Sequence, residues 1–171
     1  MAVPISTPAA AAAYSGADSV MDNTTISPEE VRASLRTAFA MVPCPETFKK
    51  LQGCGAVSHQ VCLELRRDFY NYEPQELQYL LSSVLEDAMN DPSNDLWSED
   101  VERLILQLDP LRFEDDLVRN NILEQFSIFT KEQASAICQW LKLARTWPTL
   151  SSFTDWVDRA SNYWCNRLEK V

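Results

Sequence analysis

Three short stretches of this sequence carry the signals with which an α-helix begins. A serine or threonine cap with glutamate or glutamine three residues later satisfies two backbone N–H groups that the first helical turn leaves unpaired. Residues 27–30 and 130–133 have this capping box, and residues 73–76 have a weaker form with Glu73 at the cap. Pro28 and Pro74 occupy the first helical position, which suits their fixed φ. The sequence therefore predicts the starts of three helices.

Apolar residues at helical spacing follow each of these starts. After residue 76 they recur at intervals of three and four, the pattern of a helix that buries one broad face. Three further stripes predict helices over about residues 57–69, 98–109 and 151–170. No segment shows the alternation of a strand, and tight hairpins need more than three glycines. We expect an all-α fold, a single compact domain of six to seven helices.

The first 25 residues differ from the rest of the chain. They are rich in alanine, serine, threonine and proline and contain no lysine or arginine. A secretory signal needs a basic start and an uninterrupted apolar stretch, whereas Pro4 and Pro8 interrupt this one. We expect a flexible tail over residues 1–25 and a helical domain over residues 26–171. No apolar run approaches the roughly 20 residues that span a bilayer, so we expect a cytoplasmic protein.

Eleven carboxylates lie between Glu86 and Asp116, opposed only by Arg103 and Arg112, and the whole chain has a net charge of −10. A surface of one sign attracts basic partners and repels nucleic acid and anionic membranes. Trp97 lies within this block, where it is either an ordinary packed residue or a binding hot spot. The candidate partner-binding residues are Asp91, Asp95, Trp97, Glu99, Asp100, Glu102, Glu114, Asp115 and Asp116.

The acidic block has two other interpretations, and the sequence argues against the second of them. Charge runs are usually solvated faces with no specific partner. A calcium loop would need a glycine at its sixth position, which the stretch around Asp91 and Asp95 lacks.

The five cysteines are an odd number and are scattered along the chain: Cys44, Cys54, Cys62, Cys138 and Cys165. This distribution predicts reduced thiols, some of them buried as small apolar residues.

His59 is the only histidine, and it allows two kinds of chemistry. Cys44, Cys54, His59 and Cys62 could together close a tetrahedral zinc site, although their spacing differs from that of the usual knuckles. His59 and Cys62 could also form a nucleophilic pair, but such a pair needs an orienting third group that the sequence does not indicate. An ordinary histidine near solvent with two ordinary cysteines is favoured over both, the metal site comes next, and we expect no cofactor.

Three segments together resemble a small bacterial domain family of uncharacterised function. They are residues 38–43, the helix start at residues 72–81, and the stretch from Phe129 through Leu143. The resemblance covers about residues 28–145 and implies an all-helical bacterial protein. It implies no catalytic residue.

These observations favour a non-catalytic protein whose acidic face masks a basic surface of a protein partner. The most natural version is an immunity protein that neutralises a bacterial toxin. The alternative is a zinc-stabilised regulatory domain, and an enzyme would need a cleft that sequence does not reveal. We expect no binding of nucleic acid or membrane, because the charge is acidic. The oligomeric state stays open.

Overall fold

The computed structural model describes residues 26–51, 55–90 and 95–167, with side chains at all of these except 51 and 95–98. Its α-helices are α1 (Pro28–Phe39), α2 (Glu46–Leu51), α3 (His59–Arg67), α4 (Pro74–Ala88), α5 (Asp95–Gln107), α6 (Asp116–Ser127), α7 (Lys131–Ala144) and α8 (Thr154–Asn166). Three short 3-10 helices join them: η1 (Phe69–Asn71), η2 (Pro110–Arg112) and η3 (Pro148–Phe153).

The described residues contain no strand, so the predicted all-α fold is confirmed. The six predicted stripes correspond to α1, α3, α4, α5, α7 and α8. We did not predict α2 or α6 from a stripe of their own. None of the helices in the described part of the chain is long and apolar enough to cross a membrane. The expected tail, residues 1–25, lies outside the described residues.

The capping boxes form as the sequence predicts. The Ser27 hydroxyl accepts a hydrogen bond from the Glu30 backbone at 3.2 Å, and the Glu30 carboxylate accepts one from the Ser27 backbone at 2.9 Å. Thr130 and Gln133 exchange the same two bonds at the start of α7. These caps need only residues three apart, which is why the sequence alone locates them.

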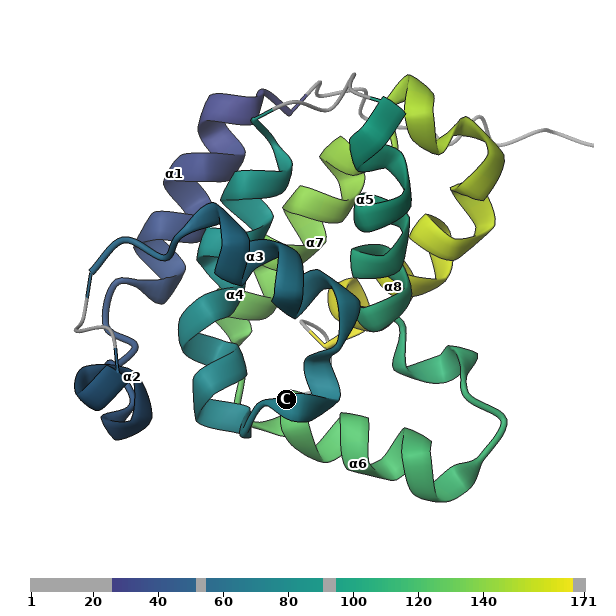
Figure 1. Ribbon diagram of the computed structural model, residues 1–171. Helices are drawn as coiled ribbons and strands as arrows, with labels where there is room; N and C mark the ends of the chain where they lie inside the picture. The colour runs from purple at the N-terminus through teal and green to yellow at the C-terminus, as the bar shows by residue number, and fades with distance from the viewer. Residues whose placement is uncertain (1–25, 52–54, 91–94, 168–171) are drawn as a thin grey trace, which may run out of the picture.

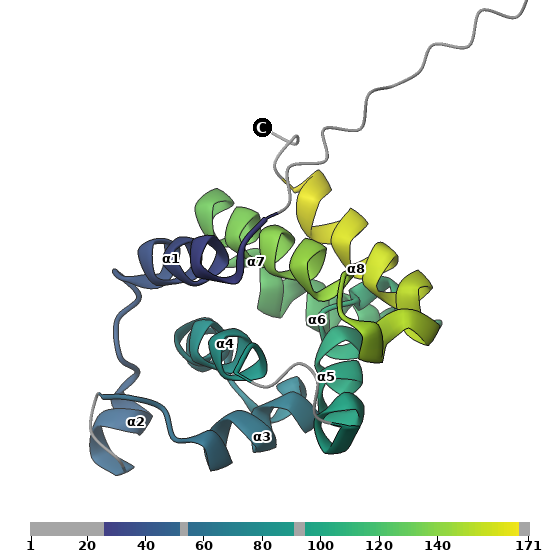
Figure 2. The same ribbon diagram turned by 90° about the horizontal axis from the view of Figure 1, so that it is seen from above.

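Six helices form a closed ring of neighbours around the core, as the view from above shows (Figure 2). In ring order they are α1, α4, α3, α5, α8 and α7, each in contact with the next, and α7 returns to α1. α6 lies across one end of this ring, where it contacts α4 and η2 (Figure 1). The residues at the predicted stripe positions of α4, from Leu77 to Ala88, are buried in the core.

Two buried tryptophans connect helices of the ring by hydrogen bonds to carbonyls at the ends of other helices. The indole Nε1 of Trp140 in α7 donates to the carbonyl of Leu85 at 2.9 Å, in the last turn of α4. Trp164 in α8 donates to the carbonyl of Leu108 at 2.9 Å, just beyond α5. A helix leaves its last carbonyls without partners inside the helix. Each indole therefore fills space in the core and also donates a hydrogen bond to a buried carbonyl.

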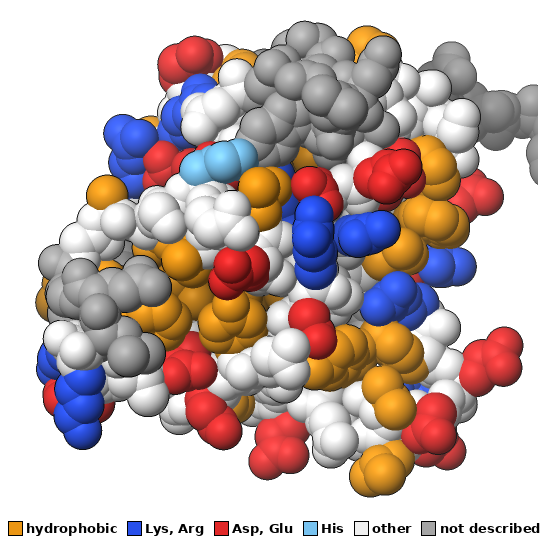
Figure 3. Space-filling model, in the orientation of Figure 1, with side chains coloured by type: hydrophobic (Ala, Val, Ile, Leu, Met, Phe, Trp, Pro, Cys, Tyr) orange, Lys and Arg blue, Asp and Glu red, His pale blue; other side chains and the backbone are white. Residues whose placement is uncertain are grey.

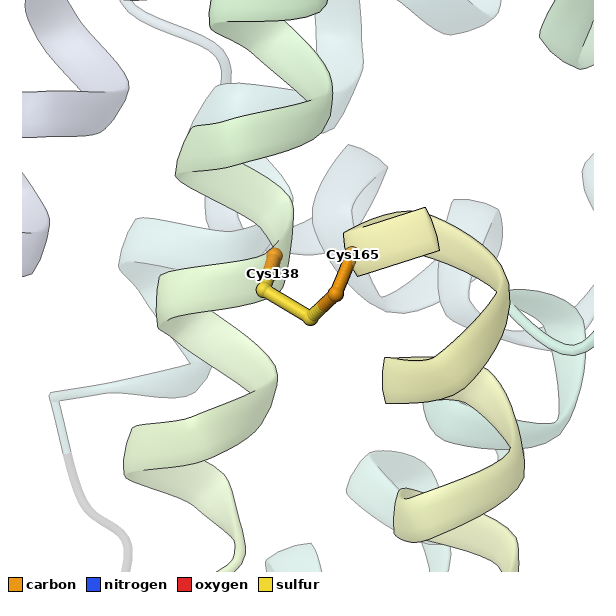
Figure 4. The surroundings of a disulfide bond; sticks show 2 residues. All are labelled: Cys138 and Cys165. Atoms are coloured by element: carbon orange, nitrogen blue, oxygen red, sulfur yellow. A yellow bond between two sulfur atoms is a disulfide. The ribbon is translucent and has the colours of Figure 1, made fainter. Parts of the chain in front are cut away.

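The expectation that the cysteines are reduced is wrong. Cys138 of α7 and Cys165 of α8 form a disulfide, with their Cα atoms 5.3 Å apart (Figure 4). Cys44 is also disulfide-bonded, whereas Cys62 is a buried free thiol. The sequence did not reveal the pair because 27 positions separate the two cysteines, and only the packing of α7 on α8 brings them together.

Replacing Cys138 and Cys165 together by alanine should lower the free energy of unfolding by about 3 kcal/mol, because the disulfide restricts the unfolded chain. For a domain of this size, that is a fall of roughly 6–12 °C in melting temperature. The measurement is urea denaturation of both proteins with and without a dithiol reductant. The variant should be the less sensitive of the two to reductant. Equal stability of the two oxidised proteins would contradict the prediction.

Candidate functional site

The acidic block does not form one continuous acidic face among the described residues, because arginines from elsewhere in the chain pair with part of it. Glu86 pairs with Arg36 at 2.8 Å. Asp109, whose side chain is fully buried, pairs with Arg159 at 3.0 Å. The expected single-sign surface is therefore smaller than the sequence suggests.

The candidate acids of α5 are likewise only partly exposed. Glu99 is exposed, whereas Asp100 is largely covered and lies 3.7 Å from Arg67. Burial raises the pKa of Glu102, and the charge of Glu99 adds to the effect. Asp91 lies outside the described residues. The side chains of Asp95 and Trp97 also lie outside them, so the proposed role of Trp97 stays a prediction.

The remaining candidate acids, Glu114, Asp115 and Asp116, are all exposed and surround the start of α6. Large apolar side chains accompany them in the same part of the molecule. Leu117 is 72% exposed, and Leu111 in η2 is 57% exposed. Figure 3 shows hydrophobic and acidic side chains gathered at the lower right, where α6 begins in Figure 1. We call this region the α6-entry surface; it consists of Tyr70, Leu111, Phe113, Glu114, Asp115, Asp116 and Leu117.

Aromatic contacts fix the apolar centre of the α6-entry surface. The rings of Tyr70 and Phe113 meet edge to face, with centroids 5.8 Å apart. The guanidinium of Arg112 lies 4.2 Å from the centroid of Phe113, and the Arg119 guanidinium donates to the carbonyl of Phe113 at 3.1 Å. Both local arginines thus contact Phe113, and Arg119 also forms an exposed ion pair with Asp116.

The backbone of the α6-entry surface is held by its own carboxylates and by α8. Asp115 caps α6, accepting from the backbone of Leu117 at 2.8 Å and of Val118 at 3.1 Å. Asp109 accepts from the Leu111 backbone at 3.1 Å and also binds Arg159 of α8. These contacts fix η2 and the first turn of α6 relative to the core.

A second cluster of ionisable groups lies between α3 and α4. Asp87 pairs with Arg66, which is fully buried, at 2.7 Å and with the Nδ1 atom of His59 at 2.9 Å. Cys62 lies on the same helix as His59 and is buried. Burial raises the pKa of the Cys62 thiol to about 11, with a smaller contribution from Asp87. A thiol with so high a pKa is a poor nucleophile at neutral pH. Cys62 is therefore not the activated thiol that a nucleophilic pair with His59 would need.

The proposed zinc ligands are not assembled in the described part of the chain. The disulfide bond of Cys44 leaves it without a thiolate to bind a metal. Cys54 lies outside the described residues, and the imidazole of His59 contacts Asp87. Within the described residues, no group of three or more histidine, cysteine, aspartate or glutamate side chains could hold a metal ion.

An open groove of about 970 Å³ lies between α1 and the first turn of α7. Small side chains such as Ala33, Thr37 and Ser135 are among its lining residues, as is Met41, which is 91% exposed. Its charged lining residues, Lys131 and Glu132, are both exposed. Buried catalytic groups are thus not gathered in this groove.

Comparison with protein-family models, with curated proteins and with solved structures gave no match. We therefore infer function from the geometry of the described residues.

The sequence indicated the acidic part of the α6-entry surface but not its apolar part. Leucine is among the residues most often buried in folded proteins. The sequence therefore predicts that Leu111 and Leu117 turn inward. Their exposure follows from the short η2 helix and the position of α6 at the end of the ring. One signal was available: Leu117 directly follows three consecutive acids.

Within the acidic block, a carboxylate that pairs with a buried arginine should contribute far more to stability than an exposed carboxylate. Asp87→Asn removes the charge that opposes the buried Arg66, and we expect it to lower the free energy of unfolding by about 3 kcal/mol or more. Asp116→Asn removes an exposed ion pair with Arg119 and should cost less than about 1 kcal/mol. Chemical denaturation of both variants measures the difference. Similar costs would contradict the distinction between buried and exposed acids.

Proposed function

We propose that this protein is a non-catalytic binding protein that masks a basic surface of another protein with its α6-entry surface. The observation that carries the proposal is the combination of exposed apolar side chains with exposed carboxylates at one end of the molecule. Leu111 and Leu117 expose most of their side chains to water, which is unfavourable unless a partner covers them.

The composition of this surface fits the usual anatomy of a protein interface. Interfaces have an apolar centre enriched in aromatic residues and a polar rim. Here Phe113 and Tyr70 supply the aromatic centre, and Glu114 and Asp116 supply rim charges. Rim charges of one sign speed the encounter with a partner of opposite sign, while the desolvated centre sets the rate of dissociation.

The packing beneath this surface supports tight binding. Asp115 fixes the first turn of α6, and α8 fixes η2 through Arg159 and Asp109. A surface that is already ordered loses less conformational entropy when a partner binds. The same contacts make a rearrangement of the backbone at this site unnecessary.

An immunity protein that neutralises a toxin is the most natural biological form of this function. A toxin that acts on nucleic acid needs a basic surface, which an acidic protein could cover. The disulfide between Cys138 and Cys165 changes where we expect this to happen. Disulfides persist in oxidising compartments and are rare in the cytosol, so we propose that the partner is met outside the reducing cytosol.

The test compares what three immobilised proteins retain from the cells that make this chain. They are the natural sequence, a charge-reversal variant with Glu114→Lys and Asp116→Lys, and a matched control with Glu29→Lys and Asp155→Lys. The control has the same charge change, also at exposed acids at or next to the start of a helix, but on α1 and α8. We expect a basic protein that the natural sequence and the control retain and the charge-reversal variant loses.

Kinetics with the retained partner then separate the two parts of the surface. Charge reversal should slow association about tenfold or more at low salt, and the difference should shrink near physiological ionic strength. Leu117→Ala should mainly speed dissociation, because it removes part of the desolvated centre. A partner retained equally by all three proteins would show that binding occurs elsewhere on the molecule.

A further inference from the structure

A hollow of about 270 Å³ lies between η2 and the last turns of α8, and it shares Leu111 with the α6-entry surface. Its other lining residues are Asn162, Tyr163, Asn166 and Arg167. The volume is below the range of sites for drug-sized ligands, roughly 300–1,000 Å³, and suits one large side chain. Most of the exposed lining is apolar, with the two asparagine amides one helical turn apart on α8.

The chemistry of the lining selects the kind of side chain that fits. Arg167 is already engaged: its guanidinium donates to the carbonyl of Phe126 at 2.6 Å and lies 5.8 Å from the ring of Tyr163. A lysine or arginine entering the hollow would meet this positive charge. An aromatic ring instead gains a contact with the guanidinium and with Tyr163, and its polar atom can reach an asparagine amide.

The carboxylates near the hollow favour basic residues on either side of the aromatic residue in the partner. Glu114 follows Leu111 by three residues, which is at most about 10 Å of extended chain. Glu114 and Asp116 are exposed there. Basic residues one or two positions from the aromatic ring in a partner chain can therefore reach Glu114 while the ring is in the hollow.

We propose that the hollow between η2 and α8 binds an aromatic side chain of the partner, tryptophan or tyrosine, that is flanked by lysine or arginine. This proposal rests on the proposed function, since it identifies the segment that the α6-entry surface recognises. The hollow acts as the anchor that gives specificity, and the carboxylates attract any basic chain.

Two peptides test the proposal directly: acetyl-Lys-Lys-Trp-Lys-Lys-amide and the same peptide with glycine in place of tryptophan. Titration monitored by NMR of the ¹⁵N-labelled full chain gives both dissociation constants. We expect the tryptophan peptide to bind about fivefold more tightly, with shifts at Leu111, Asn162 and Asn166. Asn162→Phe, which fills the hollow, and Leu111→Ala, which removes one wall, should bring the ratio of the two constants close to one.

Two controls separate failure of the anchor from failure of the proposed function. Met41→Ala, an exposed apolar residue outside both the hollow and the α6-entry surface, should leave the ratio unchanged. Glu114→Lys with Asp116→Lys should weaken both peptides alike. Equal binding of the two peptides, weakened by charge reversal, would overturn the anchor and leave the acidic surface standing. If charge reversal changes neither peptide, or neither binds, both proposals fail.

A second copy of this chain is the other possible occupant of the hollow. Sedimentation velocity at two concentrations of the natural sequence and of Asn162→Phe distinguishes it. A monomer in both cases supports a separate partner. A dimer that Asn162→Phe dissociates would assign the hollow to the second copy and overturn the proposal.

Discussion

The attachment of α8 to the end of α5, to η2 and to the last turn of α6 is the constraint on which the site depends. Arg159 neutralises the fully buried Asp109, and Trp164 donates to the carbonyl of Leu108. Arg167 donates to the carbonyl of Phe126 in the last turn of α6. The disulfide at Cys165 fixes α8 to α7 in turn. Without α8, the buried charge of Asp109 and the carbonyl of Leu108 would lose these partners, which is costly inside a protein.

This arrangement explains how a chain with few glycines ends its helices. Glycine is the usual residue just beyond a helix, where it lets the chain turn back on the last carbonyls. Here donors from distant helices bind those carbonyls: Trp140 binds Leu85, Trp164 binds Leu108, and Gln107 binds Arg67 at 3.2 Å. Helix starts could be predicted because a cap and its partner lie three residues apart. The donors that bind these three carbonyls could not, because they lie 40 to 56 positions away.

The same difference between local and distant partners limited what the sequence could say about the site. The sign and the position of the charge could be predicted from the sequence, and the exposed acids at the start of α6 were among the predicted residues. It did not reveal that Arg66 and Arg159 would pair with Asp87 and Asp109, which are 21 and 50 positions away. The apolar part of the surface also escaped prediction, because the exposure of Leu111 and Leu117 depends on where α6 lies relative to the ring.

The central claim is that a basic partner covers the α6-entry surface and leaves the groove between α1 and α7 open. Hydrogen–deuterium exchange of the complex with the captured partner, compared with the protein alone, tests it most directly. The account predicts slower exchange around η2 and the first turn of α6, with no change along α1. Protection along α1 and the first turn of α7, with none around α6, would place the partner in the groove and contradict the claim.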